Sequence, residues 1–355
     1  MLQKTEITQL LHNTLSAKFP MARQGGPSGD ITFDETMKMD RVDGTKAGYA
    51  RNIKHLVQFL RRRRPDLVGE NNDLDLPNVP VEELKAFLDH VKIKRKNVRH
   101  DGIFSDPVDK INDKFVLNST EHVSGYRSAL KWFYEEKNVD FPAHLNKQIS
   151  RFTVGFKRVK NQRKQDGEEE ADEGKAPMQF NAYEWLAKTA LSSTTDFMTS
   201  VFSWVYLLLA WNLIARGKNV GKVMFEHIGW EDDALTLRMF VKKHDQEGKD
   251  VRPKHVFANP IKPYICPILA LGIYVFTMGP RRPGSKNLVF GNECAMARFS
   301  KWLGRILRNF ASALKAMGVR IDVVGTHSFR KGTATHLMGL VDGPSGITVS
   351  HLDWD

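Results

Sequence analysis

The sequence predicts a mainly helical protein with a small antiparallel sheet, divided into two domains. In the first half, apolar residues recur at three- and four-residue steps, which is the period of an amphipathic helix, and no strand signal interrupts them. In the second half, short strand-like segments alternate with helical ones. An abrupt switch from basic to acidic residues separates the halves. A chain of 355 residues is long enough for two domains that each bury a core.

Four amphipathic helices are expected in the first half. The first ends at four consecutive arginines followed by Pro65, which cannot continue a helix. The third begins after Asn118–Ser119–Thr120, residues that favour a helix N-cap. The four predicted helices cover residues 45–60, 81–91, 121–133 and 145–156.

The boundary between the halves is predicted from charge. Residues 144–165 hold seven Lys or Arg and no acid, whereas residues 166–173 hold six acids. Such a switch is typical of an exposed segment, and the basic part could run along a DNA backbone. We therefore expect a flexible leader at 1–40, a helical domain at 41–165, an acidic linker at 166–176 and a second domain at 177–355.

The second domain is predicted to be mixed. Helices are expected at residues 182–191, 197–214, 267–276, 298–317 and 327–340. Strands are expected at residues 223–230, 235–241 and 251–257, with a polar turn at 244–248 joining the last two.

Composition narrows the class of protein. Lys and Arg total 53 against 41 Asp and Glu, and a net charge of +12 favours a polyanionic partner such as nucleic acid. Two cysteines outside any paired ligand pattern argue against a disulfide framework or a zinc site. The N-terminus lacks the apolar core of a signal peptide, and the longest apolar stretch, 201–215, is too short for a membrane span. We expect an intracellular protein with no membrane association, metal or small-molecule cofactor.

Three segments carry residues suited to phosphate chemistry. Arg216 ends a buried helix, and Lys242 and Lys243 lie at the tip of the predicted hairpin. His327 and Arg330 are three residues apart, on one face of a helix that Thr326 could cap. Each segment alone is also common in purely structural settings, so their order along the chain carries the argument.

An arginine, a hairpin lysine and a helical His-x-x-Arg, following an all-helical domain, resemble the tyrosine recombinases (integrases). The nearest similarity is to the eukaryotic, transposon-derived Crypton-like branch. The resemblance covers about residues 40–355, and its most specific part is the block from His327 to Gly332. The segments that carry it are 125–134, 173–178, 211–219, 265–272 and 325–335. It implies a helical core-binding (SAM-like) domain followed by an α+β recombinase catalytic domain.

The resemblance also implies a reaction: metal-free DNA strand cleavage and rejoining through a 3′-phosphotyrosine, as in DNA integration. The partner would be double-stranded DNA, with self-association on it, in the nucleus if the host is eukaryotic. Arg216 and Arg330 would hold the non-bridging phosphate oxygens, because planar guanidinium groups match phosphate geometry. Lys243, or alternatively Lys242, would protonate the leaving 5′-oxygen, and His327 would hydrogen-bond the phosphate.

Further roles follow from position. Trp354, or alternatively His351, lies where the family has a second His or Trp. The expected contacts to the DNA backbone are Lys157, Arg158, Lys160 and Lys331.

Two departures from the family pattern stand out. Gly217–Lys218–Asn219 follows Arg216, where an acidic residue is common in the family, and all seven tyrosines precede His327. Since the family's nucleophile follows this histidine, we expect a chain truncated before the tyrosine, or a decayed element. The readings left open are a recombinase that receives its tyrosine from missing sequence or a partner subunit, a non-catalytic DNA-binding protein, and a helical interaction scaffold.

Overall fold

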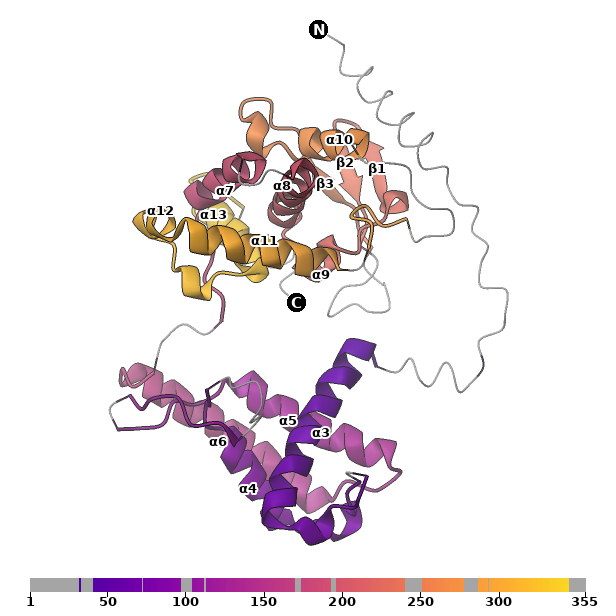
Figure 1. Cartoon of the computed structure of the whole chain (residues 1–355), viewed down its shortest axis with the longest axis vertical. Helices are drawn as coiled ribbons and strands as arrows, with labels where there is room; N and C mark the ends of the chain where they lie inside the picture. Colours follow the sequence, from indigo (N-terminus) through magenta and orange to yellow (C-terminus); the bar gives the residue numbers. More distant parts are fainter. Residues whose placement is uncertain are drawn as a thin grey trace. The chain divides into compact units, whose positions relative to one another are not determined.

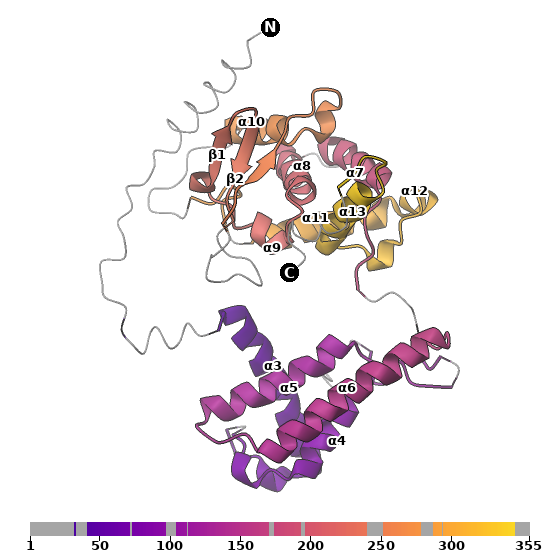
Figure 2. The ribbon, with the colours of Figure 1, turned by 180° about the vertical axis from the view of Figure 1, so that it is seen from behind.

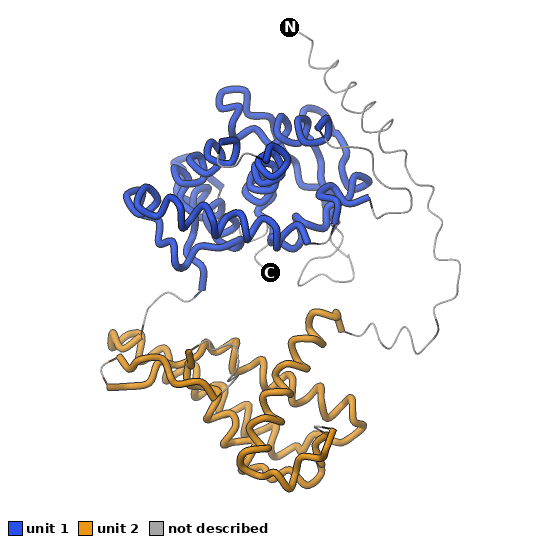
Figure 3. The backbone as a smooth tube through the Cα atoms, viewed as in Figure 1, with its two compact units in different colours: residues 1–26, 174–355 blue, residues 27–173 orange. Residues whose placement is uncertain are grey.

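The computed structural model describes residues 32, 41–71, 73–96, 104–111, 113–169, 174–192, 196–239, 251–277, 287–292 and 294–344 (Figure 1). These fall into two compact units, one ending at residue 169 and the other beginning at residue 174 (Figure 3). The described residues are mostly helical, with one three-stranded antiparallel sheet, which confirms the predicted fold class. The predicted leader lies outside the described residues, except for Thr32.

The helical unit contains all four helices expected from the periodicity. They are α3 (Asp43–Arg63), α4 (Val81–Val91), α5 (Thr120–Glu136) and α6 (Ala143–Gln165). Ser119 caps α5, because its hydroxyl accepts a hydrogen bond from the His122 amide at 3.1 Å. Leu56, Leu84 and Leu130 are completely or almost completely buried where these helices meet. Each such side chain stabilises the unit by roughly 1.5–3 kcal/mol relative to an exposed one.

Helix α6 runs nine residues past the predicted end at Phe156, to Gln165. Its buried face continues through Thr153, Phe156 and Lys160, which supplies a tertiary reason for the helix to persist. The acidic residues that follow pack on the same unit. Glu168 pairs with Lys114 and Arg163, and Glu169 accepts a hydrogen bond from the Leu117 amide at 3.2 Å. Residues 166–169, assigned to the linker from their charge, are therefore attached to the helical unit.

The mixed unit is built around one apolar helix, α8 (Phe197–Asn212). Every residue from Ser200 to Trp211 is buried, as expected for a helix that is apolar on all sides. Figures 1 and 2 show α8 in the middle of the unit with other helices around it. They are α7 (Phe180–Ser192), α9 (Gly217–Val220), α10 (Pro267–Thr277), α11 (Ala295–Asn309), α12 (Ala311–Ala316) and α13 (Thr326–Met338). Among the described helices none has the length and apolarity needed to cross a membrane.

The sheet is shorter than the sequence predicts. Its strands are β1 (Ile228–Glu231), β2 (Ala234–Leu237) and β3 (Lys254–Val256), paired antiparallel in that order. The expectation of a strand over 223–227 is wrong. Residues Phe225–His227 form a 3₁₀ turn instead, because the His227 ring nitrogen accepts a hydrogen bond from the Met224 amide at 3.3 Å. The predicted hairpin tip lies outside the described residues.

The long helix predicted over 298–317 is two helices. Phe310 leaves helical geometry, with φ −117° and ψ 29°, and separates α11 from α12. Its ring packs edge-on against Trp185, with the ring centroids 5.3 Å apart. A tertiary contact thus accompanies a break that the period alone does not reveal.

Candidate nucleic-acid interface

A strained turn after α8 positions Arg216. Ile214 has φ 51°, in the left-handed region that β-branched residues avoid, at a cost of about 1–3 kcal/mol. The Lys254 ammonium holds this turn by donating to the Leu213 carbonyl at 2.8 Å. The backbone then returns to an extended conformation at Arg216, which is the N-cap of α9.

Gly217, the next residue, lies where four helices meet. A Cβ atom at this position would lie 3.2 Å from the Thr326 Cβ, 3.2 Å from the Tyr206 hydroxyl and 3.3 Å from the Met296 Cγ. The Tyr206 hydroxyl also donates to the Gly217 carbonyl at 2.5 Å. A glycine is required here because these neighbours leave no room for a side chain. The contact brings the Arg216 turn against the first residue of α13.

Helix α13 begins differently from the sequence prediction. Thr326 is its first residue, not its cap, and Gly325 is the N-cap. The buried Ser328 hydroxyl accepts a hydrogen bond from the Gly325 amide at 3.0 Å. Thr333, two turns along, donates to the Trp211 carbonyl at 3.1 Å and ties α13 to the end of α8.

The predicted residues of α13 differ in burial. His327 is exposed, Lys331 is half-buried, and Arg330 retains only 8% exposure. Burial of a guanidinium requires compensating interactions, so Arg330 is held in place more firmly than a surface arginine would be. Because Thr326 contacts Gly217, the structure brings the His327 turn and the Arg216 turn together although 111 residues separate them in sequence.

Two hydrogen-bond donors on the Arg216 turn are buried without partners. Arg216 Nη1 and Asn219 Nδ2 make no hydrogen bond to any described residue. Buried polar groups are almost always satisfied, so two orphaned donors three residues apart need a physical explanation. Both nitrogens can only donate hydrogen bonds, so each needs an acceptor. A phosphate oxygen is one such acceptor.

Lys175 is a cation of this region that the sequence reasoning did not single out. A Cβ atom at Gly325 would lie 3.1 Å from the Lys175 Cε, so this lysine crosses the start of α13. Its segment is fixed by a hydrogen bond of 2.9 Å from the Ala176 amide to the Val323 carbonyl. In the sequence, Lys175 is marked only by its place in segment 173–178, which carries the recombinase resemblance. That place assigns no function to its side chain. Four other predicted residues lie outside the described part of the chain: Lys242, Lys243, His351 and Trp354.

The three cations predicted on α6 do not share one face. Lys157 and Arg158 are exposed, whereas Lys160 is 4% exposed. The Lys160 ammonium donates to the Asn118 carbonyl at 2.7 Å and lies 3.8 Å from a Glu169 carboxylate oxygen. The expectation that Lys160 contacts DNA is therefore corrected, because its charge is used inside the helical unit.

None of the seven tyrosines is exposed. Five are buried, and the other two, Tyr49 and Tyr264, are partly buried. Burial raises the pKa of Tyr126 to about 12 and raises the pKa of Tyr183 and Tyr206 further. Tyr206 lies next to the Arg216 turn, but its hydroxyl is committed to the Gly217 carbonyl. A nucleophile needs access and an oxygen that can be deprotonated, and burial denies both to Tyr126, Tyr183 and Tyr206.

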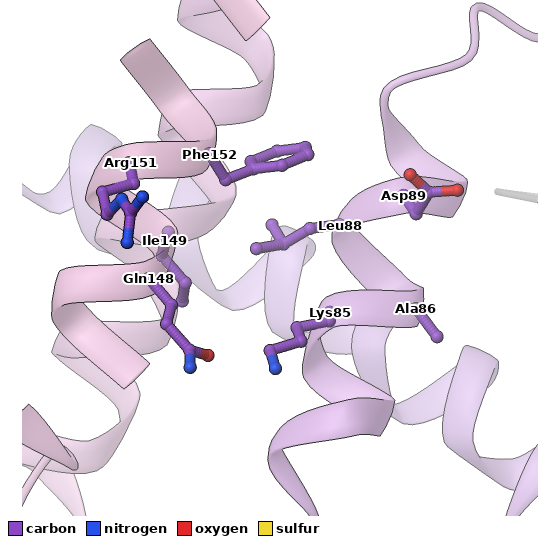
Figure 4. A pocket seen from close by; sticks show the side chains of 8 residues that line it. All are labelled: Lys85, Ala86, Leu88, Asp89, Gln148, Ile149, Arg151 and Phe152. Atoms are coloured by element: carbon purple, nitrogen blue, oxygen red, sulfur yellow. The ribbon is translucent and has the colours of Figure 1, made fainter. Parts of the chain in front are cut away.

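The helical unit also has a groove of about 520 Å³ between α4 and α6 (Figure 4). Figure 4 shows Leu88 and Phe152 facing each other across it, with Lys85 and Gln148 at one end. Arg151 and Asp89 lie on opposite sides of the same groove. Its charges are mixed and its floor is apolar, which is not the pattern of a phosphate site.

No protein-family model matches this sequence, and no curated protein matches it. Among solved structures, the chain is similar to the XerH site-specific recombinase bound to difH substrate in a pre-cleavage complex, at 15% identity and a TM-score of 0.47. It is also similar to XerH bound to palindromic difH substrate in a post-cleavage complex, at 14% identity and a TM-score of 0.42. Both matches cover 78% of this chain, and they cover 64% and 70% of the respective XerH chains.

Proposed function

We propose that this chain is a recombinase-type DNA-binding protein that holds a backbone phosphate at the junction of α9 and α13. The carrying observation is the contact between Gly217 and Thr326, which places the Arg216 turn beside the His327 turn. The buried Nη1 of Arg216, which has no partner among the described residues, supports a phosphate as the missing acceptor.

The local charge supports the same partner. Residues 213–222 and 323–336 contain no acid and carry Arg216, Lys218, Lys222, Arg330 and Lys331. Lys175 adds a further cation beside Gly325. Concentrated positive charge of this kind binds duplex DNA largely through its phosphates, with an affinity that decreases steeply with salt.

Arg216→Ala tests the proposal. It should weaken binding to a short duplex by about tenfold to a hundredfold, because one charge-assisted contact is lost. The slope of log K against log salt should decrease by about one. Fluorescence anisotropy at several salt concentrations measures both quantities.

Arg308→Ala is the matched control. Arg308 is an exposed arginine of the same unit, about three turns along α11 from the Met296 that contacts the junction. It should bind DNA like the unmodified chain. Equal effects of the two substitutions would mean that only net charge matters and would refute a specific phosphate site at Arg216.

The finer proposal is that the site belongs to the tyrosine-recombinase reaction, DNA strand cleavage and rejoining through a 3′-phosphotyrosine, in the transposon-derived Crypton-like branch. In that reaction Arg216 and Arg330 stabilise charge on the phosphate, His327 donates a hydrogen bond and Lys243 supplies the proton for the 5′-oxygen. Duplex DNA, self-association on it and a nuclear location belong to the same proposal. A protein that binds DNA without cutting it is the alternative, favoured by the burial of the chain's tyrosines.

A further inference from the structure

The helical unit contains a second cavity, which shares no lining residue with the groove between α4 and α6. Most of the residues that line it are polar. Its volume is about 160 Å³, enough for several water molecules or one small anion. Three helices and an adjoining segment contribute to it: His55 from α3, His90 from α4, Tyr126 from α5 and Arg95 after α4. The remaining lining residues are Val91, Ile93, Lys96, Ser105, Asn118 and His122. None of these described lining residues is an acid.

Arg95 is partly committed and partly unsatisfied. Its Nη1 donates to the Ser105 carbonyl at 3.1 Å, and its Nη2 lies 3.3 Å from the His90 Nδ1. Its Nε is buried and has no hydrogen-bond partner among the described residues. The guanidinium is therefore held in one orientation with a donor left over, and the described residues that line the cavity include no carboxylate.

Two histidines face the same space from neighbouring helices. The His55 Nδ1 is 2.8 Å from the Tyr126 hydroxyl, and the His122 ring lies edge-on to the Tyr126 ring with centroids 5.2 Å apart. Burial lowers the pKa of His55, and the nearby His122, Arg51 and Lys54 lower it further. Burial also lowers the pKa of His122. Burial, the first cause for both residues, thus favours the neutral form of each imidazole.

The charged groups around the cavity are mostly basic. Arg51 and Lys54 come from α3, and Lys96 from the segment after α4, where it pairs with Asp109 at 3.4 Å. Among the described groups, Asp106 raises the pKa of Arg95, and this effect is smaller than the lowering of that pKa by burial.

We propose that this cavity is a binding site for one tetrahedral oxoanion of the phosphate class, held by Arg95, His55 and His122. Guanidinium and imidazolium groups are the side chains that bind phosphate by charge-assisted hydrogen bonds. The anion supplies the negative charge that permits both imidazoles to be protonated, so anion and protons bind together. The site lies in the helical unit and does not depend on the phosphate site proposed at Arg216.

The phosphate can be free or part of a DNA backbone, and one experiment separates these sources. Imidazole Cε1–H resonances of the full-length unmodified chain are followed by NMR during pH titrations without ligand, with inorganic phosphate and with a short duplex. Inorganic phosphate should raise the pKa of His55 and His122, and should bind at least about tenfold more tightly at pH 5.5 than at pH 7.5. A response to the duplex only would identify a backbone phosphate as the ligand.

Three variants provide assignment and control. His55→Gln and His122→Gln remove one resonance each and should weaken phosphate binding, whereas His144→Gln should not. His144 is an exposed histidine on α6 of the same unit, outside the cavity. If neither ligand moves the His55 and His122 resonances, or if His144 responds as strongly as they do, the proposal is overturned. The pKa changes are read from the unmodified chain, and the variants serve to assign its resonances.

Discussion

At the scale of single residues, burial decides which cations can meet DNA. Lys160, which the sequence assigns to the DNA backbone, is 4% exposed, whereas Lys157 and Arg158 on the same helix are exposed. The Lys160 ammonium donates to the Asn118 carbonyl, just before α5. It also lies beside the Glu169 carboxylate, just after α6. A charged side chain in this position contributes to the fold and not to the electrostatic attraction of a ligand.

Lys160→Met should therefore reduce stability without changing DNA binding. Glu169, whose side chain is 6% exposed, would lose its ammonium partner and keep Arg163 as an ion-pair partner and the Leu117 amide as a hydrogen-bond donor. The free energy of unfolding should fall by about 3 kcal/mol, as measured by urea denaturation. Lys157→Met, at an exposed position of the same helix, should change it by less than about 0.5 kcal/mol. A reduced salt slope of DNA binding for Lys160→Met would contradict this assignment.

The histidines of the small cavity predict a dependence of stability on pH. The pKa values of His55 and His122 are lowered from the ordinary value of 6.5, so the unfolded chain takes up protons before the folded chain does. Stability is therefore full above pH 6.5 and decreases as the pH falls below it. Urea denaturation at pH 7.5 and 5.5 measures the difference in the free energy of unfolding. The double variant that combines His55→Gln and His122→Gln should show a smaller difference. An undiminished difference in the double variant would assign the pH dependence to other groups.

At the scale of elements, α13 depends on close backbone contact. A Cβ atom at Gly332 would lie 2.1 Å from the Met178 carbonyl oxygen, on the segment that crosses α13 before α7. The Met178 amide also donates to the Ser328 carbonyl at 2.8 Å. This packing fixes the face on which His327 and Arg330 are presented.

Gly332→Ala should destabilise the chain by at least about 2 kcal/mol, because the backbone of Met178 or of α13 must move. Gly155→Ala is the matched control in the interior of another helix, where an added Cβ meets nothing within 4 Å. It should stabilise the chain by up to about 1 kcal/mol, because alanine favours helix more than glycine does. Thermal unfolding distinguishes the opposite signs, and a neutral Gly332→Ala would show that α13 and residue 178 are not in this contact.

At the scale of the whole molecule, a net charge of +12 should make DNA binding strongly salt-dependent. We expect the exposed Lys157 and Arg158 on α6 to contribute to this salt dependence. Replacing Lys157 and Arg158 together with Ala should weaken binding to unrelated duplexes alike and lower the salt slope by up to about two. Anisotropy titrations with two duplexes of different sequence measure this, and an unchanged slope would exclude this part of α6 from the interface.

Whether the chain cleaves DNA or only binds it is also a property of the whole molecule. With all seven tyrosines buried or partly buried, we expect this chain to bind DNA without forming a covalent adduct. A suicide duplex with a nick beside the scissile phosphate would trap an adduct for a denaturing gel. A covalent band that disappears when Tyr264 or another of the seven is changed to Phe would disprove the expectation.

The sequence by itself determined the presence of the four helices of the first unit, the mixed composition of the second unit, the basic character and the order of Arg216, His327 and Arg330 along the chain. These are local or additive properties, because apolar periodicity and charge can be read within a few turns. Only the tertiary structure decided that Gly217 meets Thr326, that Lys160 is buried and that Gly325 precedes α13 as its cap. The carbonyl that accepts from Lys160 belongs to a residue 42 positions earlier, and no local pattern specifies such a partner.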